Sequence, residues 1–121
     1  MINFKRLDHI QICIPVGKEK EAREFYTGII GLTEIPKPQA LVPNGGLWYQ
    51  IADIQFHIGV ESEMNKSKRH PAFEVTNLDE ARQHLEKKEW PLKKKYKFMG
   101  KADFHLLIRL EIGLSCCKNF D

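Results

Sequence analysis

The chain has 121 residues, of which 42% are hydrophobic and 29% are charged, and its net charge is +3. This length supports one compact core and is short for two ordinary domains, so we expect a single domain over residues 1–121. The first residues, MINFKRLDHIQICIPV, lack the apolar run and the cleavage site of a secretion signal, and no uncharged apolar run reaches the ~20 residues that cross a bilayer. We therefore expect a soluble, cytoplasmic protein without a membrane partner.

The basic residues and the cysteines favour no specialised role. Most of the positive excess lies in KKEWPLKKKYKFMGK, which has neither the pattern of a recognition helix nor a base-stacking motif. We interpret it as a solvated loop and expect no nucleic-acid partner. Cys13, Cys116 and Cys117 show neither the spacing of a zinc site nor that of a disulfide framework, which favours reduced thiols.

The first predicted element is a strand in DHIQICIPV, because apolar and polar residues alternate strictly there. One face carries Ile10, Ile12 and Ile14, and the other carries His9, Gln11 and Cys13. A helix follows in KEKEAREFYTGIIG, where Gly31 is placed to end it. Its apolar stripe consists of Ala22, Phe25, Tyr26 and Ile29. Further strands are expected near LTEIPKP, LWYQIAD and IQFHIGVE, with a turn at PNGG.

The same order of elements recurs in the second half, which indicates an internal repeat. RHPAFEVTN predicts a strand, and NLDEARQHLEKK predicts a helix in which Asn77 is the N-cap and Glu80 lies three residues later. Strands are then expected in KKYKFM and ADFHLLI, and His9 and His70 hold matching positions in the two repeats. We expect module one at about residues 5–62, module two at about 68–107 and an atypical tail at 108–121.

Over roughly residues 5–107 the chain resembles the vicinal-oxygen-chelate superfamily, which contains glyoxalases, bleomycin-resistance proteins and extradiol dioxygenases. The matching segments are LDHIQICIPV, EAREFYTGIIGL, IQFHIGVE and HPAFEV, in that order. The resemblance implies an α+β fold of two β-α-β-β-β modules, related by a pseudo-two-fold, whose sheets form a cup. It also implies that the cup binds a divalent metal, which we expect to be Mn, Fe, Ni or Zn, and a small oxygen-bearing substrate. Family modules also pair between chains, so we expect a homodimer.

The resemblance points to His9 and His70 as metal ligands, because these two histidines occupy the ligand strands of the two modules. Gln55 stands where some glyoxalases carry a ligand glutamate, so a site of two histidines and one carboxylate fits better than a four-ligand site. We expect Gln11, Gln55 and His57 to contact substrate, and Trp48 or Tyr49 to line the pocket. The alternative for these polar residues is an ordinary structural role. No catalytic residue is identified, and His84 and His105 receive no role.

The tail LLIRLEIGLSCCKNFD departs from the family, whose second module ends in a strand that reads D-P-x-G-N-x-I-E and supplies a ligand glutamate. Permitted codons for residues 107–121, read one frame over, spell D-P-F-G-N-R-I-E-L-L-Q-K-F followed by a stop. We interpret the tail as a frame-shifted version of the last ligand strand. The chain then retains two imidazoles, which predicts a metal that is bound weakly or is absent, and Glu111 is not placed to substitute.

Three functions remain open from the sequence. The intact form is expected to be a metal-dependent lyase, isomerase, dioxygenase or thiol transferase. A different class is a metal-free protein of the bleomycin-resistance type, which sequesters a small molecule such as an antibiotic without chemistry. The third is that this polypeptide is impaired by loss of the C-terminal ligand strand.

Overall fold

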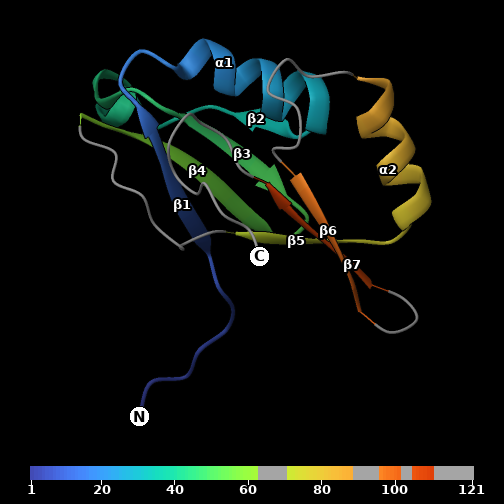
Figure 1. Cartoon of the computed structure of the whole chain (residues 1–121). Helices are drawn as coiled ribbons and strands as arrows, with labels where there is room; N and C mark the ends of the chain where they lie inside the picture. Colours follow the sequence, from blue (N-terminus) through green and yellow to red (C-terminus); the bar gives the residue numbers. More distant parts are fainter. Residues whose placement is uncertain (63–70, 89–95, 102–104, 111–121) are drawn as a thin grey trace. The chain divides into compact units, whose positions relative to one another are not determined.

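The computed structural model describes residues 1–62, 71–88, 96–101 and 105–110 (Figure 1). The chain divides into two compact units, Met1–Ser62 and Glu63–Asp121. The first unit contains, in chain order, β1 (His9–Pro15), α1 (Glu19–Arg23), the π-helical segment η1 (Glu24–Ile30), β2 (Thr33–Ile35), the 3-10 helix η2 (Gln39–Asn44), β3 (Leu47–Ile51) and β4 (Ile54–Glu61). This order contains the β-α-β-β-β module that the sequence predicts.

The four strands of unit 1 form one sheet in the order β1-β4-β3-β2. Strand β1 runs parallel to β4, whereas β3 is antiparallel to both β4 and β2. A parallel neighbour requires a crossover connection, and α1 with η1 forms that crossover along one face of the sheet (Figure 1). The helix ends at Gly31, as predicted, because Gly31 adopts a left-handed φ of 85°.

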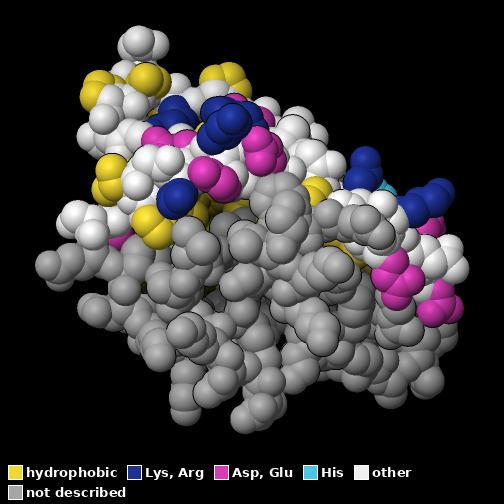
Figure 2. All heavy atoms as spheres, turned by 45° about the horizontal axis from the view of Figure 1, so that its top comes forward, with side chains coloured by type: hydrophobic (Ala, Val, Ile, Leu, Met, Phe, Trp, Pro, Cys, Tyr) yellow, Lys and Arg dark blue, Asp and Glu magenta, His cyan; other side chains and the backbone are white. Residues whose placement is uncertain are grey.

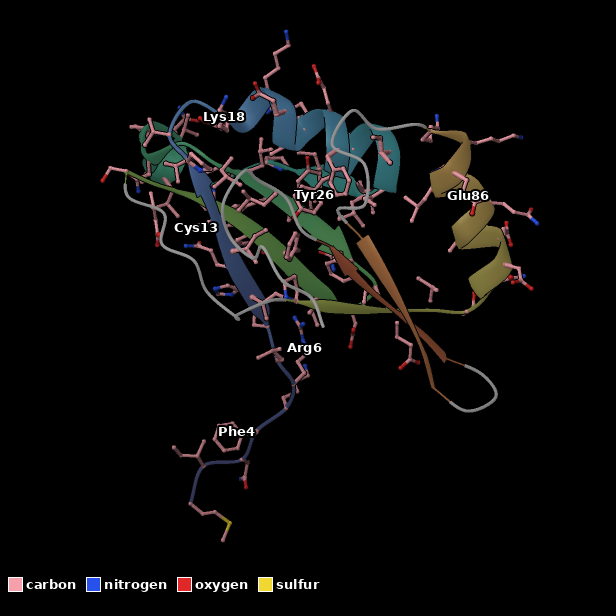
Figure 3. The ribbon with its side chains drawn as sticks, in the orientation of Figure 1. Phe4, Arg6, Cys13, Lys18, Tyr26 and Glu86 are labelled. Atoms are coloured by element: carbon pink, nitrogen blue, oxygen red, sulfur yellow. The ribbon has the colours of Figure 1, made fainter. Side chains whose placement is uncertain are left out.

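The core of unit 1 lies between this helix and the sheet. The predicted helical stripe is buried, and so is one face of the strands: the buried residues are Ile14, Ala22, Phe25, Tyr26, Ile29, Leu47, Tyr49, Phe56 and Ile58. Tyr26 extends from the helix toward the sheet (Figure 3), where its ring meets Phe56 at a centroid distance of 5.3 Å and Tyr49 at 5.8 Å. Burial of each large apolar side chain stabilises the fold by about 1.5–3 kcal/mol.

The outward face of α1 carries charges of both signs. Its exposed residues are the acidic Glu21 and the basic Lys20 and Arg23. Basic and acidic side chains are interspersed over this region of the surface (Figure 2). Arg23 is further paired with Glu34 of β2 through a 2.8 Å contact from Nε to Oε1. The mixture of signs is that of a solvated helix face.

Two loops of unit 1 set the positions of β3 and β4. Strand β3 begins after Gly46, where an added Cβ would lie 2.1 Å from the carbonyl oxygen of Ile58, so only glycine fits. At the other end of β3, Ala52 takes a left-handed φ of 47° in the two-residue turn to β4. The amide of Gln50 donates to the carbonyl oxygen of Ala52, and the guanidinium of Arg6 donates to that of Asp53.

The described part of unit 2 contains β5 (Ala72–Val75), α2 (Leu78–Lys87), β6 (Tyr96–Lys101) and β7 (His105–Leu110). The predicted N-cap is confirmed, because the side-chain oxygen of Asn77 accepts a 3.0 Å hydrogen bond from the backbone N–H of Glu80. The strands form a sheet in the order β5-β7-β6, with both pairings antiparallel. The two units therefore begin alike and differ in pairing, since β1 has a parallel neighbour and β5 has an antiparallel one.

The described elements confirm the α+β class and most of the predicted strand and helix positions. Strand β5 begins at Ala72, and the proposed ligand His70 lies outside the described residues. The same holds for residues 111–121, which contain most of the atypical tail. None of the helices in the described ranges combines the length and apolar character needed to cross a bilayer.

Candidate functional site

The sheet of unit 1 has a second face, opposite the core, that gathers most of the candidate residues. Side chains alternate along a strand, so residues that flank the buried Ile14, Tyr49, Phe56 and Ile58 point to this other face. In the register, His9 is paired with Gln55, and Gln11 and Trp48 are both paired with His57. We call this surface the polar face; its members are His9, Gln11, Cys13, Trp48, Gln50, Gln55, His57 and Gly59.

Three aromatic rings are stacked across β3, β4 and β1 on the polar face. The rings of Trp48 and His57 lie 3.8 Å apart between centroids at 5°, and those of His57 and His9 lie 4.3 Å apart at 19°. We call these three side chains the ring stack. His57, in the middle, is only 4% exposed. This ring therefore has little freedom to move and holds its neighbours at fixed spacing.

His57 is hydrogen-bonded to its neighbour on the same face of β4. The Nε2 atom lies 2.9 Å from Oε1 of Gln55. An amide oxygen only accepts, so Nε2 of His57 donates and Nδ1 is the acceptor nitrogen of the ring. Burial lowers the pKa of His57, and repulsion from His9 lowers it further. His57 is thus a neutral imidazole at neutral pH.

His9, the candidate ligand in the described part of the chain, is hydrogen-bonded through Nδ1, the ring nitrogen that would not bind a metal. Its Nδ1 lies 2.9 Å from Oδ2 of Asp8, and Arg6 contacts Oδ1 of the same carboxylate at 3.3 Å. The pKa of Asp8 is lowered, chiefly by the hydrogen bond from His9 and also by the charge of Arg6. Metal-bound histidines usually donate their second ring N–H to a carboxylate or a carbonyl, so this arrangement fits ligation through Nε2.

The described residues include one of the two proposed metal ligands. Within these residues, no three or more His, Cys, Asp or Glu side chains gather as a metal centre. Of the proposed ligands, His9 is the one that lies in the described part of the chain. The other proposed ligand, His70, lies outside the described residues, and so do residues 111–121.

Gly59 has no side chain, and the side chain of Gln11 uses the space that this leaves on the polar face. A Cβ at Gly59 would lie 2.8 Å from Nε2 of Gln11 and 3.4 Å from Sγ of Cys13. The amide of Gln11 occupies that space and contacts Cys13 at 4.0 Å. Gly59 thus makes room on the polar face for the Gln11 amide, which can donate and accept hydrogen bonds.

The structure separates Trp48 from Tyr49, which the sequence left as alternatives for the pocket wall. Tyr49 lies on the core side, is 0% exposed, and shares a 2.9 Å hydrogen bond between its hydroxyl and that of Thr27. Burial raises the pKa of Tyr49. Trp48 points the other way and belongs to the ring stack, so Tyr49 is excluded from the polar face.

Sequence reasoning missed three residues that shape this face. Asp8 lies in the matching segment LDHIQICIPV and Arg6 directly precedes it, but neither was assigned a role. The acidic residue directly before the histidine was a usable signal. Gly59 breaks the alternation of IQFHIGVE, and a glycine within a strand often marks a place where another group approaches closely.

Comparisons with known proteins include a related structure and a more distant structure that shares the fold. No protein-family model matches the chain, and no curated protein matches it in sequence. The crystal structure of a Bacillus anthracis protein assigned to the glyoxalase family aligns with a TM-score of 0.69 and 42% identity, over 82% of this chain and 78% of that chain. An integron cassette protein from the mobile metagenome of V. cholerae aligns with a TM-score of 0.50 and 12% identity, over 88% of this chain and 85% of that chain. The second match concerns the fold alone.

Proposed function

Since this chain belongs to the glyoxalase family and has its α+β fold, we propose that it binds a small oxygen-bearing molecule on the polar face of unit 1 and acts on it as a metal-dependent enzyme. The reaction would be that of a lyase, an isomerase, a dioxygenase or a thiol transferase. The observation that carries the proposal is the hydrogen bond of His9 to Asp8. Nδ1 of His9 donates to the Asp8 carboxylate, which leaves Nε2 as the acceptor nitrogen of this stacked ring.

In this proposal His9 and His70 hold a divalent ion, one of Mn, Fe, Ni or Zn, which when bound supplies Lewis-acid chemistry toward a substrate oxygen. The sequence lacks the D-P-x-G-N-x-I-E strand that would add a carboxylate ligand. Two imidazoles hold such an ion weakly. The chain therefore has low metal affinity and low activity compared with a form that carries this strand intact.

The remaining members of the polar face bind and orient the substrate. The amides of Gln11 and Gln55 offer donors and acceptors to its oxygen atoms. Trp48 provides an apolar wall, and the buried His57 fixes the position of both Trp48 and His9 through the stack. Because His57 is neutral, it adds no positive charge next to the site.

A second candidate function is sequestration of a small molecule without chemistry, as in bleomycin-resistance proteins. The ring stack favours it, because its roughly parallel rings, spaced at 3.8 and 4.3 Å, hold the outer ring in a fixed orientation on which a flat ligand can stack. In that case His9 would contact the ligand through its ring face, and no metal would be required.

Metal binding separates the two functions. We would titrate the protein with Mn²⁺, Ni²⁺ and Zn²⁺ by calorimetry, using His9→Ala, His70→Ala and, as a control, His84→Ala, which changes an exposed histidine of α2. The enzyme proposal expects weak binding that either of the first two variants removes and the third preserves. Binding that survives loss of both His9 and His70 would overturn the ligand assignment. No binding by the chain with a restored last strand would favour sequestration.

The exposed N-terminal segment supports the proposal that the protein is a homodimer. Met1, Ile2, Phe4 and Leu7 are 114%, 75%, 89% and 61% exposed, and Phe4 lies on the extended chain that precedes β1 (Figure 3). Exposed apolar side chains in such number are typical of surfaces that a partner covers. A second copy of the chain is the partner that the family relationship favours.

A further inference from the structure

Three polar groups in series connect the turn between β3 and β4 to the ring of His9. The guanidinium of Arg6 donates to the carbonyl oxygen of Asp53 at 2.5 Å and also contacts Asp8 at 3.3 Å. The second oxygen of Asp8 lies 2.9 Å from Nδ1 of His9. The backbone joins the same groups, because the N–H of Gln55 donates to the carbonyl oxygen of Asp8 at 3.0 Å.

We propose that Asp8 is a positioning residue for His9: its carboxylate accepts the Nδ1 proton and thereby keeps Nε2 free to bind. Arg6 holds the carboxylate in place from the other side. This inference deepens the proposed function, since it rests on His9 as the ligand, but its central claim concerns the proton on the ring and holds without any metal.

The ring stack adds a second, independent constraint on His9. The hydrogen bond to Asp8 fixes which nitrogen carries the proton, while the contact with His57 at 4.3 Å fixes the plane of the ring. His57 is itself held by Trp48 and by Gln55. A half-exposed imidazole on a surface strand would otherwise sample several rotamers and both tautomers.

The stability of the fold is the wrong property with which to test this role. The side chains of Arg6 and Asp8 are 43% and 68% exposed, and exposed ion pairs contribute little to folding. A neutral imidazole in water favours the proton on Nε2, which is the atom that must be bare to bind a metal. The expected effect of losing Asp8 is therefore a change of tautomer.

Nuclear magnetic resonance of the metal-free protein, with its imidazole nitrogens labelled, measures that tautomer directly. At pH 8.5, where an ordinary imidazole is neutral, we expect the His9 proton on Nδ1 in the wild type and mostly on Nε2 in Asp8→Ala. His9→Ala identifies the signals. Asp53→Ala is the matched control. It also removes one negative charge near Arg6, but it keeps the backbone carbonyl of residue 53 to which Arg6 donates. In this variant we expect the His9 proton to stay on Nδ1.

The second readout is Zn²⁺ affinity by calorimetry. Loss of a group that orients a metal ligand typically lowers affinity 10–100-fold, so we expect a loss of about 10-fold in Asp8→Ala and none in Asp53→Ala. Arg6→Ala should give a smaller increase of the Nε2 tautomer than Asp8→Ala. Backbone amide spectra confirm that each variant is folded.

The outcomes separate this inference from the proposed function. If the wild-type proton lies on Nε2, or if Asp8→Ala leaves it on Nδ1, the positioning role is overturned whatever the metal data show. If the tautomer changes as expected but Zn²⁺ binding does not depend on His9, the positioning role stands and the metal-dependent function fails.

Discussion

Two glycines, Gly59 within β4 and Gly46 directly before β3, provide a test that separates the site from the fold. A Cβ at Gly59 would lie 2.8 Å from Nε2 and 3.2 Å from Cδ of Gln11, which are atoms of a flexible side chain. A Cβ at Gly46 would lie 2.1 Å from the carbonyl oxygen of Ile58, which is backbone within the sheet, and Gly46 has a φ of +88°. The same substitution to alanine should therefore have different consequences at the two positions.

The expected costs follow from what has to move. In Gly59→Ala the Gln11 side chain rotates away, and the lower chain entropy of alanine in the unfolded state offsets part of this cost, so stability changes by less than about 1 kcal/mol. In Gly46→Ala the left-handed conformation alone costs about 1–2 kcal/mol, and the clash with the Ile58 carbonyl adds displacement of β4. We expect a loss of about 3 kcal/mol or more, on the order of the largest effects of single substitutions.

Urea unfolding measures both free energies, and the side-chain amide signals of Gln11 report the site. Gly59→Ala should leave the unfolding midpoint nearly unchanged while it moves the Gln11 signals and alters ligand binding. Equal destabilisation by the two substitutions, or unmoved Gln11 signals in Gly59→Ala, would refute the description of Gly59 as the residue that makes room for this amide.

The coding DNA, read one frame over from the end of codon 107, should spell D-P-x-G-N-x-I-E and then a stop, and an unrelated string there ends the frameshift hypothesis. Replacing residues 107–121 with D-P-F-G-N-R-I-E-L-L-Q-K-F should strengthen metal binding at least tenfold, about 1.4 kcal/mol, and His9→Ala or His70→Ala should abolish that gain in calorimetry. Light scattering should show a homodimer that deletion of residues 2–5 weakens; a wild-type monomer at micromolar concentration contradicts this. Because the pKa of His57 is lowered in the folded state, the unfolded chain binds more protons below pH 6.5, so stability should fall as the pH decreases from 6.5 toward that lowered pKa. Urea midpoints between pH 8 and pH 5 measure this slope, and His57→Gln should reduce it.

Local patterns made the elements of this fold predictable. The alternation in β1 and the apolar stripe on α1 and η1 indicate which side chains are buried. The Asn77 cap involves two residues that are three positions apart. Such features involve neighbours in the chain, so the sequence alone contains them.

The contacts of the site could not be predicted in the same way. The ring stack joins Trp48 and His57 to His9, and it depends on the parallel pairing of β1 with β4 and on the register of β3. Register between strands distant in sequence is set by the packed sheet as a whole. For the same reason the sequence indicated that Trp48 or Tyr49 lines the site but could not tell which of them faces away from the core.

The closeness of Trp48 to His57 also makes the site optically visible. An indole in van der Waals contact with an imidazole loses excited-state energy to the ring when the imidazole is protonated, so the emission of Trp48 depends on the charge of its neighbour. Because the centroids lie 3.8 Å apart and the planes are only 5° from parallel, protonation of His57 at low pH would strongly quench the emission of Trp48. The chain has one other tryptophan, Trp90, and Trp90→Phe would leave Trp48 as the sole emitter. Its fluorescence would then report the protonation of His57 without any added label.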